Sequence, residues 1–153
     1  MTDGTLAPLQ HLNSDRFVIR SAVTAIRNAF THVSERQPLA FGPGERRAAA
    51  RVGLRIPVRM TAAVVEQASV RLGEGFRSWI AAFSLDISLG GIGLTHPLPL
   101  ARGCAIVRFE IPASDAICLV VEFTWSNLTA DGSCKSGARI LGLIDPDGHA
   151  AGW

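Results

Sequence analysis

Arg46-Arg47-Ala48-Ala49-Ala50-Arg51, followed directly by the stretch Val52 to Met60, is the part of the sequence on which the fold prediction depends. From Leu54 to Met60, apolar residues alternate with arginine or proline, which is the period of a β-strand with one buried face. Pro57 lies inside this stretch and indicates a strand edge or a bulge. The chain is therefore predicted to enter a β-strand immediately after a cluster of arginines.

A second stretch, Asp86-Ile87-Ser88-Leu89-Gly90-Gly91, ends one apolar segment and begins another. It supplies the pattern Asp-x-Ser-x-x-Gly, whereas the first stretch supplies Arg-x-x-x-Arg as Arg47 and Arg51. Guanidinium groups bind phosphate, or the O6/N7 edge of guanine, through paired hydrogen bonds. A carboxylate accepts hydrogen bonds from the N1 and N2 hydrogens of guanine, and glycine lets the backbone approach a ligand closely. Together these residue types suit an anionic guanine nucleotide.

Either motif alone is common, because Arg-x-x-x-Arg occurs on solvated helix faces and Asp-x-Ser-x-x-Gly in ordinary turns. In this order and context, however, they resemble the motifs of the PilZ domain, the bacterial receptor module for cyclic di-GMP. The resemblance extends from about Glu45 to Leu143 and includes Gly103 before a later strand, Trp125 at a strand end and the closing segment 137–143. It implies a mainly β fold, a small six-stranded antiparallel β-barrel.

An amphipathic helix is predicted before the arginine cluster. Ser14 or Asp15 can cap it, and apolar residues then recur at spacings of three and four, at Ile19, Val23, Ile26, Phe30 and Val33. This stripe must be buried, and we expect it to pack on the barrel. A partner helix or a second copy of the protein is the alternative.

The predicted organisation has four parts. Residues 1–36 form an N-terminal extension with the helix at about 15–35, and residues 37–44, rich in glycine and proline, form a linker. Residues 45–144 form the barrel, and residues 145–153 a short tail. Segment 61–72 fits either a short helix or a continuing strand. Trp79 and Trp125 are assigned to the core, and His96, before Pro97, to a loop.

Composition places the chain among folded proteins, with 48% apolar and 18% charged residues in 153. Residues 1–60 hold nine arginines against four acidic residues, so the half that contains the arginine motif is positive. The three cysteines are not at metal-binding spacings, and Cys104 and Cys118, which lie in apolar strands, are expected to be buried reduced thiols. We find no signal peptide and no apolar run that could span a membrane, and therefore expect a cytoplasmic protein.

Other chemistry finds less support in the sequence. The four histidines are scattered, and no Gly-x-Ser-x-Gly elbow surrounds Ser88, so neither a catalytic residue nor a metal site is expected. An Arg-rich nucleic-acid-binding domain is a less favoured alternative, because no row of aromatic residues accompanies the arginines. A PilZ-like protein-interaction scaffold without nucleotide binding is the other alternative.

The resemblance implies a role for each motif residue. Arg47 and Arg51 would hold phosphates and the guanine edge, Asp86 would accept the guanine N1 and N2 hydrogens, and Ser88 would bond a phosphate or a base nitrogen. Gly91 would keep the turn open. Arg46 would add a third guanidinium group, which favours cyclic di-GMP bound as an intercalated dimer. A protein partner of unknown identity is expected downstream, and a homodimer is left open.

Overall fold

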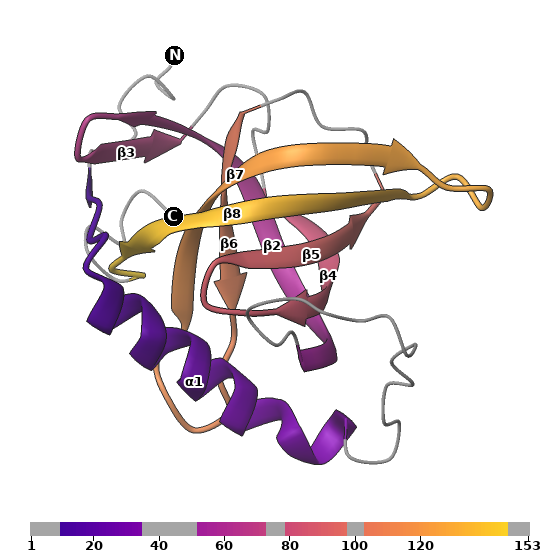
Figure 1. The fold of residues 1–153 in the computed structure, drawn as a ribbon, viewed down its shortest axis with the longest axis horizontal. Helices are drawn as coiled ribbons and strands as arrows, with labels where there is room; N and C mark the ends of the chain where they lie inside the picture. Colours follow the sequence, from indigo (N-terminus) through magenta and orange to yellow (C-terminus); the bar gives the residue numbers. More distant parts are fainter. Residues whose placement is uncertain (1–9, 35–51, 73–78, 98–102, 147–153) are drawn as a thin grey trace.

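The computed structural model describes residues 10–34, 52–72, 79–97 and 103–146. In chain order its elements are β1 (Gln10–His11), α1 (Arg16–Ser34), β2 (Val52–Glu66), β3 (Ser69–Leu72), β4 (Ile80–Ile87), β5 (Gly91–His96), β6 (Cys104–Phe109), β7 (Ile117–Leu128) and β8 (Cys134–Ile144). The predicted mainly β fold with an N-terminal helix is confirmed (Figure 1). No helix among the described residues combines the length and the hydropathy needed to cross a membrane.

Six strands close into an antiparallel barrel. Their order is β2-β4-β5-β8-β7-β6, and β6 pairs back onto β2. The far end of β2 leaves the barrel and pairs with β3, and β1 extends this sheet as its outermost strand. The predicted six-stranded antiparallel barrel is therefore confirmed. Closure satisfies the backbone hydrogen bonds that an open sheet would leave at its edges.

The alternation predicted for β2 is present, with Ile56, Val58 and Met60 buried and the arginines and proline between them exposed. Pairing with β6 begins at Arg59, so Pro57 lies where β2 has a neighbour on only one side. Proline lacks the N–H that a second neighbour would require. Segment 61–72, which the sequence left between helix and strand, continues β2, turns at Gln67 and Ala68, and returns as β3.

Helix α1 begins as its sequence predicts. An Asp15 Oδ1 atom accepts a hydrogen bond from the backbone N–H of Phe17 at 2.7 Å, so Asp15 is the N-cap. Ile19, Val23 and Ile26 are buried and Phe30 is partly buried, as the predicted stripe requires. The side chain of Val33 lies outside the described part of the chain.

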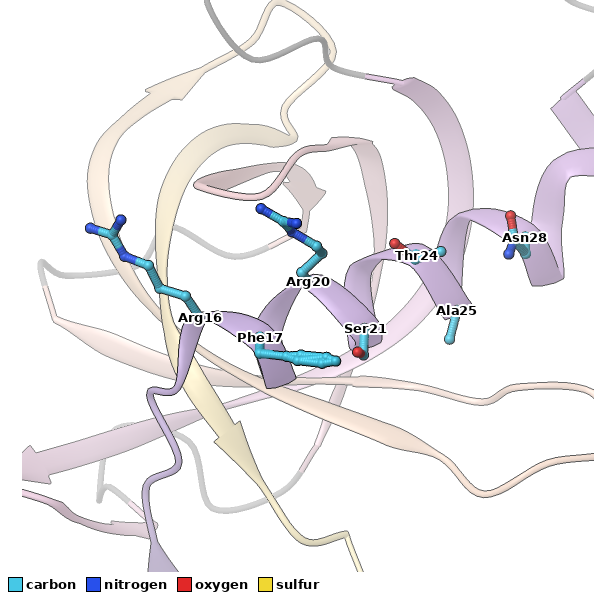
Figure 2. Close-up of a pocket in the computed structure, with 7 residues that line it drawn as sticks. All are labelled: Arg16, Phe17, Arg20, Ser21, Thr24, Ala25 and Asn28. Carbon is cyan, nitrogen blue, oxygen red and sulfur yellow. The ribbon is translucent and has the colours of Figure 1, made fainter.

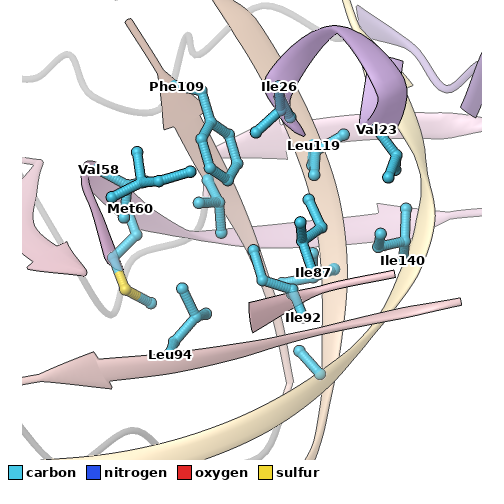
Figure 3. Close-up of a cluster of buried hydrophobic side chains, with 14 of the residues drawn as sticks. Val23, Ile26, Val58, Met60, Ile87, Ile92, Leu94, Phe109, Leu119 and Ile140 are labelled. Atoms are coloured by element: carbon cyan, nitrogen blue, oxygen red, sulfur yellow. The ribbon is translucent and has the colours of Figure 1, made fainter. Parts of the chain in front are cut away.

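The stripe packs on the protein's own barrel. Val23 and Ile26 belong to the same buried cluster as Phe109, Leu119 and Ile140 of the strands, and Figure 3 shows them meeting. In Figure 1 the helix runs obliquely past the barrel strands rather than projecting away from them. The packing expected from the sequence is therefore confirmed, and neither a partner helix nor a second copy is needed to bury the stripe.

A second cluster covers the outer face of part of the barrel. Leu12 and Val70 pack over Ile106, Cys118 and Val120, which point away from the barrel interior. Strands β6 and β7 are thus buried on both faces, which explains why their sequences read as nearly continuous apolar runs. Burial raises the pKa of the Cys118 thiol to about 12, consistent with the buried thiol expected from the sequence.

We predict that Ile26→Ala destabilises the protein by about 2–5 kcal/mol, because it leaves a cavity between the helix and the barrel. Thr24→Ala, on the exposed face of the same helix, should change the free energy of unfolding by less than about 0.5 kcal/mol. Urea denaturation followed by circular dichroism measures both. Equal stability of the two variants would contradict the packing of α1 on the barrel.

Candidate functional site

The Asp-x-Ser-x-x-Gly stretch forms the turn between β4 and β5. The backbone N–H of Ser88 donates to the carbonyl of Gly91 at 2.9 Å, and the N–H of Gly91 donates to Ser88 Oγ at 3.3 Å. The Ser88 hydroxyl also lies 3.4 Å from the Gly91 carbonyl oxygen, and Ser88 is only 4% exposed. Ser88 and Gly91 therefore close the turn on itself, while Leu89 and Gly90 at its tip are exposed.

Asp86 is held on the outer face of the barrel by an irregularity in β4. Ser84 pairs with Leu94 but Asp86 pairs with Gly93, so β4 carries one extra residue at this point. A Cβ atom on Gly93 would lie 3.0 and 3.2 Å from the two Asp86 carboxylate oxygens. The half-buried carboxylate thus lies over Gly93, in space that any other residue would fill.

The same face continues across β5 and β8 to an exposed tryptophan. Gly93 pairs with Gly137, which in turn pairs with Trp125 of β7. A Cβ on Gly137 would overlap Nε1 of Trp125 and lie 2.6 Å from its Cε2. We call Asp86, Gly93, Gly137 and Trp125 the glycine row. It is a shallow strip with a carboxylate at one end and an indole at the other.

The assignment of Trp125 to the core was wrong. Its side chain is 49% exposed, whereas Trp79 is partly buried against the second cluster, as predicted. The pairing of β7 with β8 shifts by one residue between Phe123 and Trp125. Beyond this shift, residues Thr124 to Leu128 of β7 are exposed. The alternation that points earlier residues of β7 into the barrel therefore does not extend to Trp125. Alternation read from the sequence alone does not reveal the shift.

Arg139 of β8 lies beside the glycine row. It pairs with Gly91 on one side and with Glu122 on the other, and it is exposed. Its Nη2 atom donates to Oε1 of Glu122. The sequence motifs gave neither Arg139 nor Trp125 a place in the binding site. Arg139 could have been noticed because it follows the strand residue Gly137 by two positions. Trp125 could have been noticed because it is an aromatic residue in a polar strand end.

The three arginines of the first motif, Arg46, Arg47 and Arg51, lie outside the described residues. The strand that follows them is described. Val52 pairs with Ile87, and Gly53 pairs with Asp86. Val52, which follows the arginine motif, is therefore held beside Ile87, which lies between Asp86 and Ser88. In the sequence, 34 residues lie between Arg51 and Asp86.

His96 is not the loop residue that the sequence suggested. It ends β5, is 2% exposed, and its Nε2 lies 2.7 Å from Ser136 Oγ. The Ser136 hydroxyl in turn lies 2.9 Å from Ser126 Oγ. The error has a simple cause, because β5 pairs with β8 as far as the residue before Pro97, and proline ends the ladder only after His96. Within the described ranges, no group of three His, Cys, Asp or Glu side chains is arranged to hold a metal ion.

No family model matches the chain, and no curated protein matches it.

We predict that Gly137→Ala displaces the indole of Trp125 and changes tryptophan fluorescence, because a methyl group there would occupy the space of the indole. Gly90→Ala is the matched control, since a Cβ at that exposed glycine meets nothing within 4 Å. In a Trp125→Phe background, Gly137→Ala and Gly90→Ala, each made separately, should give the same fluorescence spectrum. A difference that persists in this background would place the effect on another tryptophan.

Proposed function

We propose that this protein is a PilZ-type receptor for cyclic di-GMP that passes on the signal through a change of shape or of protein partner. The observation that carries the proposal is the pairing of β2 with β4. It holds the residue that follows Arg-x-x-x-Arg next to the Asp-x-Ser-x-x-Gly turn. Val52, the first residue after the arginine motif, thus begins β2 beside Ile87 of the second motif.

The glycine row supports a planar, hydrogen-bonding ligand. The carboxylate of Asp86 is an acceptor for the N1 and N2 hydrogens of guanine. The two glycines leave the space in which this carboxylate and the Trp125 indole lie close to the sheet. The exposed indole of Trp125 offers a face on which a base can stack, an interaction worth about 1–3 kcal/mol in nucleic-acid complexes. These features favour a base over a simple anion.

The proposed roles of the other motif residues follow from their chemistry. Arg47 and Arg51 supply the guanidinium forks for phosphate and for the guanine edge, and Arg46 supplies a third. Ser88 and Gly91 preserve the turn that carries them, through the hydrogen bonds between them. On this proposal the protein is a receptor rather than an enzyme, and its bound nucleotide is a signal rather than a cofactor.

We predict that Asp86→Asn weakens the binding of cyclic di-GMP about ten- to a hundredfold, since a charged hydrogen-bonding group contributes roughly 1.5–3 kcal/mol. Asp115→Asn, which neutralises an exposed acid in the turn between β6 and β7, should bind like the parent. Isothermal titration calorimetry measures both variants. Arg51→Ala should show a loss of similar size.

The same titration separates the proposed function from its alternatives. Heat with single-stranded DNA but none with cyclic di-GMP would favour a nucleic-acid-binding domain. No heat with either ligand would favour an interaction scaffold. If the parent binds cyclic di-GMP and Asp86→Asn binds equally well, the site lies elsewhere on the protein.

We predict two molecules of cyclic di-GMP per protomer, and a ratio near one for Arg46→Leu with binding retained. An intercalated dimer carries more negative charge and more acceptors than one molecule, and a third guanidinium can meet them. Titration against protein of known active concentration gives the ratio. A parent ratio of one, unchanged in the variant, would refute the role of Arg46 alone.

A further inference from the structure

A groove runs between helix α1 and the turn that carries the second motif. Its volume is about 490 Å³, within the range of roughly 300–1,000 Å³ typical of small-molecule sites. Its lining includes Arg16, Ile19 and Arg20 of α1, Leu89 and Gly90 of the motif turn, and Arg139 of β8. Leu89 and Gly90 are the two residues between Ser88 and Gly91, so the tip of the motif turn forms one wall of the groove.

The groove is positively charged. Arg16 and Arg20 are four residues apart on α1, a spacing that places them on the same side of a helix, and both are exposed. Figure 2 shows their side chains extending from that side, away from Phe17. Arg139 adds a third guanidinium from β8. None of the described residues that line the groove is acidic.

Two described carboxylates, Glu122 and Asp15, lie close to these arginines in the structure or in the sequence. Arg139 bonds Glu122, while the nearby Asp15 carboxylate accepts the N–H of Phe17 at the start of the helix. Among the residues that the structure describes, neither Arg16 nor Arg20 forms an ion pair. Two arginines in the first turns of a helix also lie near the positive end of its dipole, which favours an anion beside them.

The groove and the glycine row adjoin each other. The N–H of Ile140 donates to the carbonyl of Gly90 at 3.1 Å, which ties the motif turn to β8. Arg139, the preceding residue, pairs with Gly91 and stands two residues from Gly137 on the same strand. Alternate residues of a strand face the same way, so Arg139 belongs both to the groove and to the surface beside the glycine row.

We propose that Arg16 and Arg20 bind a phosphate of the cyclic dinucleotide held at the motif turn, together with Arg139. The inference rests on the proposed function and extends it, because it assigns part of the ligand site to the N-terminal helix. Guanidinium forks match the paired oxygens of a phosphate diester. Bound ligand then bridges α1 and the β4–β5 turn, so occupancy of the site is communicated to the helix.

The test is Arg16→Gln/Arg20→Gln, compared with Arg71→Gln/Lys135→Gln, which removes the same charge from positions outside the groove. Glutamine has a helix propensity close to that of arginine, so α1 should persist. In calorimetry with cyclic di-GMP, the groove variant should bind at least about tenfold more weakly than the control variant. The single substitutions Arg16→Gln and Arg20→Gln serve if the double variant loses helical circular dichroism.

Hydrogen exchange gives the second readout. In the parent, cyclic di-GMP should slow amide exchange both at residues 16–24 of α1 and at residues 86–92. In the groove variant at saturating ligand, only residues 86–92 should slow. A purely structural role for the arginines would not separate the two segments.

Three results would overturn the inference. The first is a groove variant that binds as tightly as the control variant while the parent binds cyclic di-GMP. The second is inorganic pyrophosphate competing as effectively as the dinucleotide, which would identify a general anion site. Absence of binding by the parent would contradict the receptor function itself, and this inference with it.

Discussion

The antiparallel pairing between the start of β2 and the end of β4 is the constraint on which the candidate site depends. Val52 against Ile87 and Gly53 against Asp86 fix where the chain emerges after the arginine motif. A slip of one residue would move every side chain of a strand to the opposite face. The pairing is irregular between Gly53 and Ile56, so the buried residues further along β2 do not set the register at this end. Ile87, the partner of Val52, is itself buried in the barrel core and holds the register there. Packing in the interior therefore determines the chemistry on the outside.

Helix α1 has two different faces, and each has its own role. The face with Ile19, Val23 and Ile26 completes the hydrophobic core. The neighbouring side, with Arg16 and Arg20, forms one wall of the groove beside the motif turn. Since burial of the first face fixes the helix backbone, the Cα positions of Arg16 and Arg20 are set before a ligand binds, and only their side chains remain to be ordered. The N-terminal extension is in this way part of the architecture around the motif turn.

Much of the fold could be predicted because the relevant signals are local. The alternation in β2, the stripe of α1 and its Asp15 cap depend on neighbouring residues, and the structure confirms each of them. Trp125 and His96 were misassigned because their positions depend on pairing between distant strands. A register shift in β7 exposes the first, and the pairing of β5 with β8 buries the second.

The candidate site could be predicted only in part, for the same reason. The motif residues stand out in the sequence, but Gly93 and Gly137 gain meaning only when β4, β5, β8 and β7 lie side by side. Asp86 and Trp125 are 39 residues apart in the sequence, and no local pattern predicts that they lie at the two ends of the glycine row. The contribution of α1 was equally hidden, because an arginine on a helix most often faces only water.

Amide and indole chemical shifts during a titration with cyclic di-GMP are the most direct test of nucleotide binding at the motif turn and the glycine row. A ¹H–¹⁵N correlation spectrum resolves the turn, the glycine row and the helix separately in one experiment. Binding at the motif turn should give the largest shifts at Gly53, at residues 86–93, at Gly137 and at the indole N–H of Trp125. Saturating ligand that leaves these signals in place, or that shifts only signals of β1 and β3, would contradict binding at the motif turn.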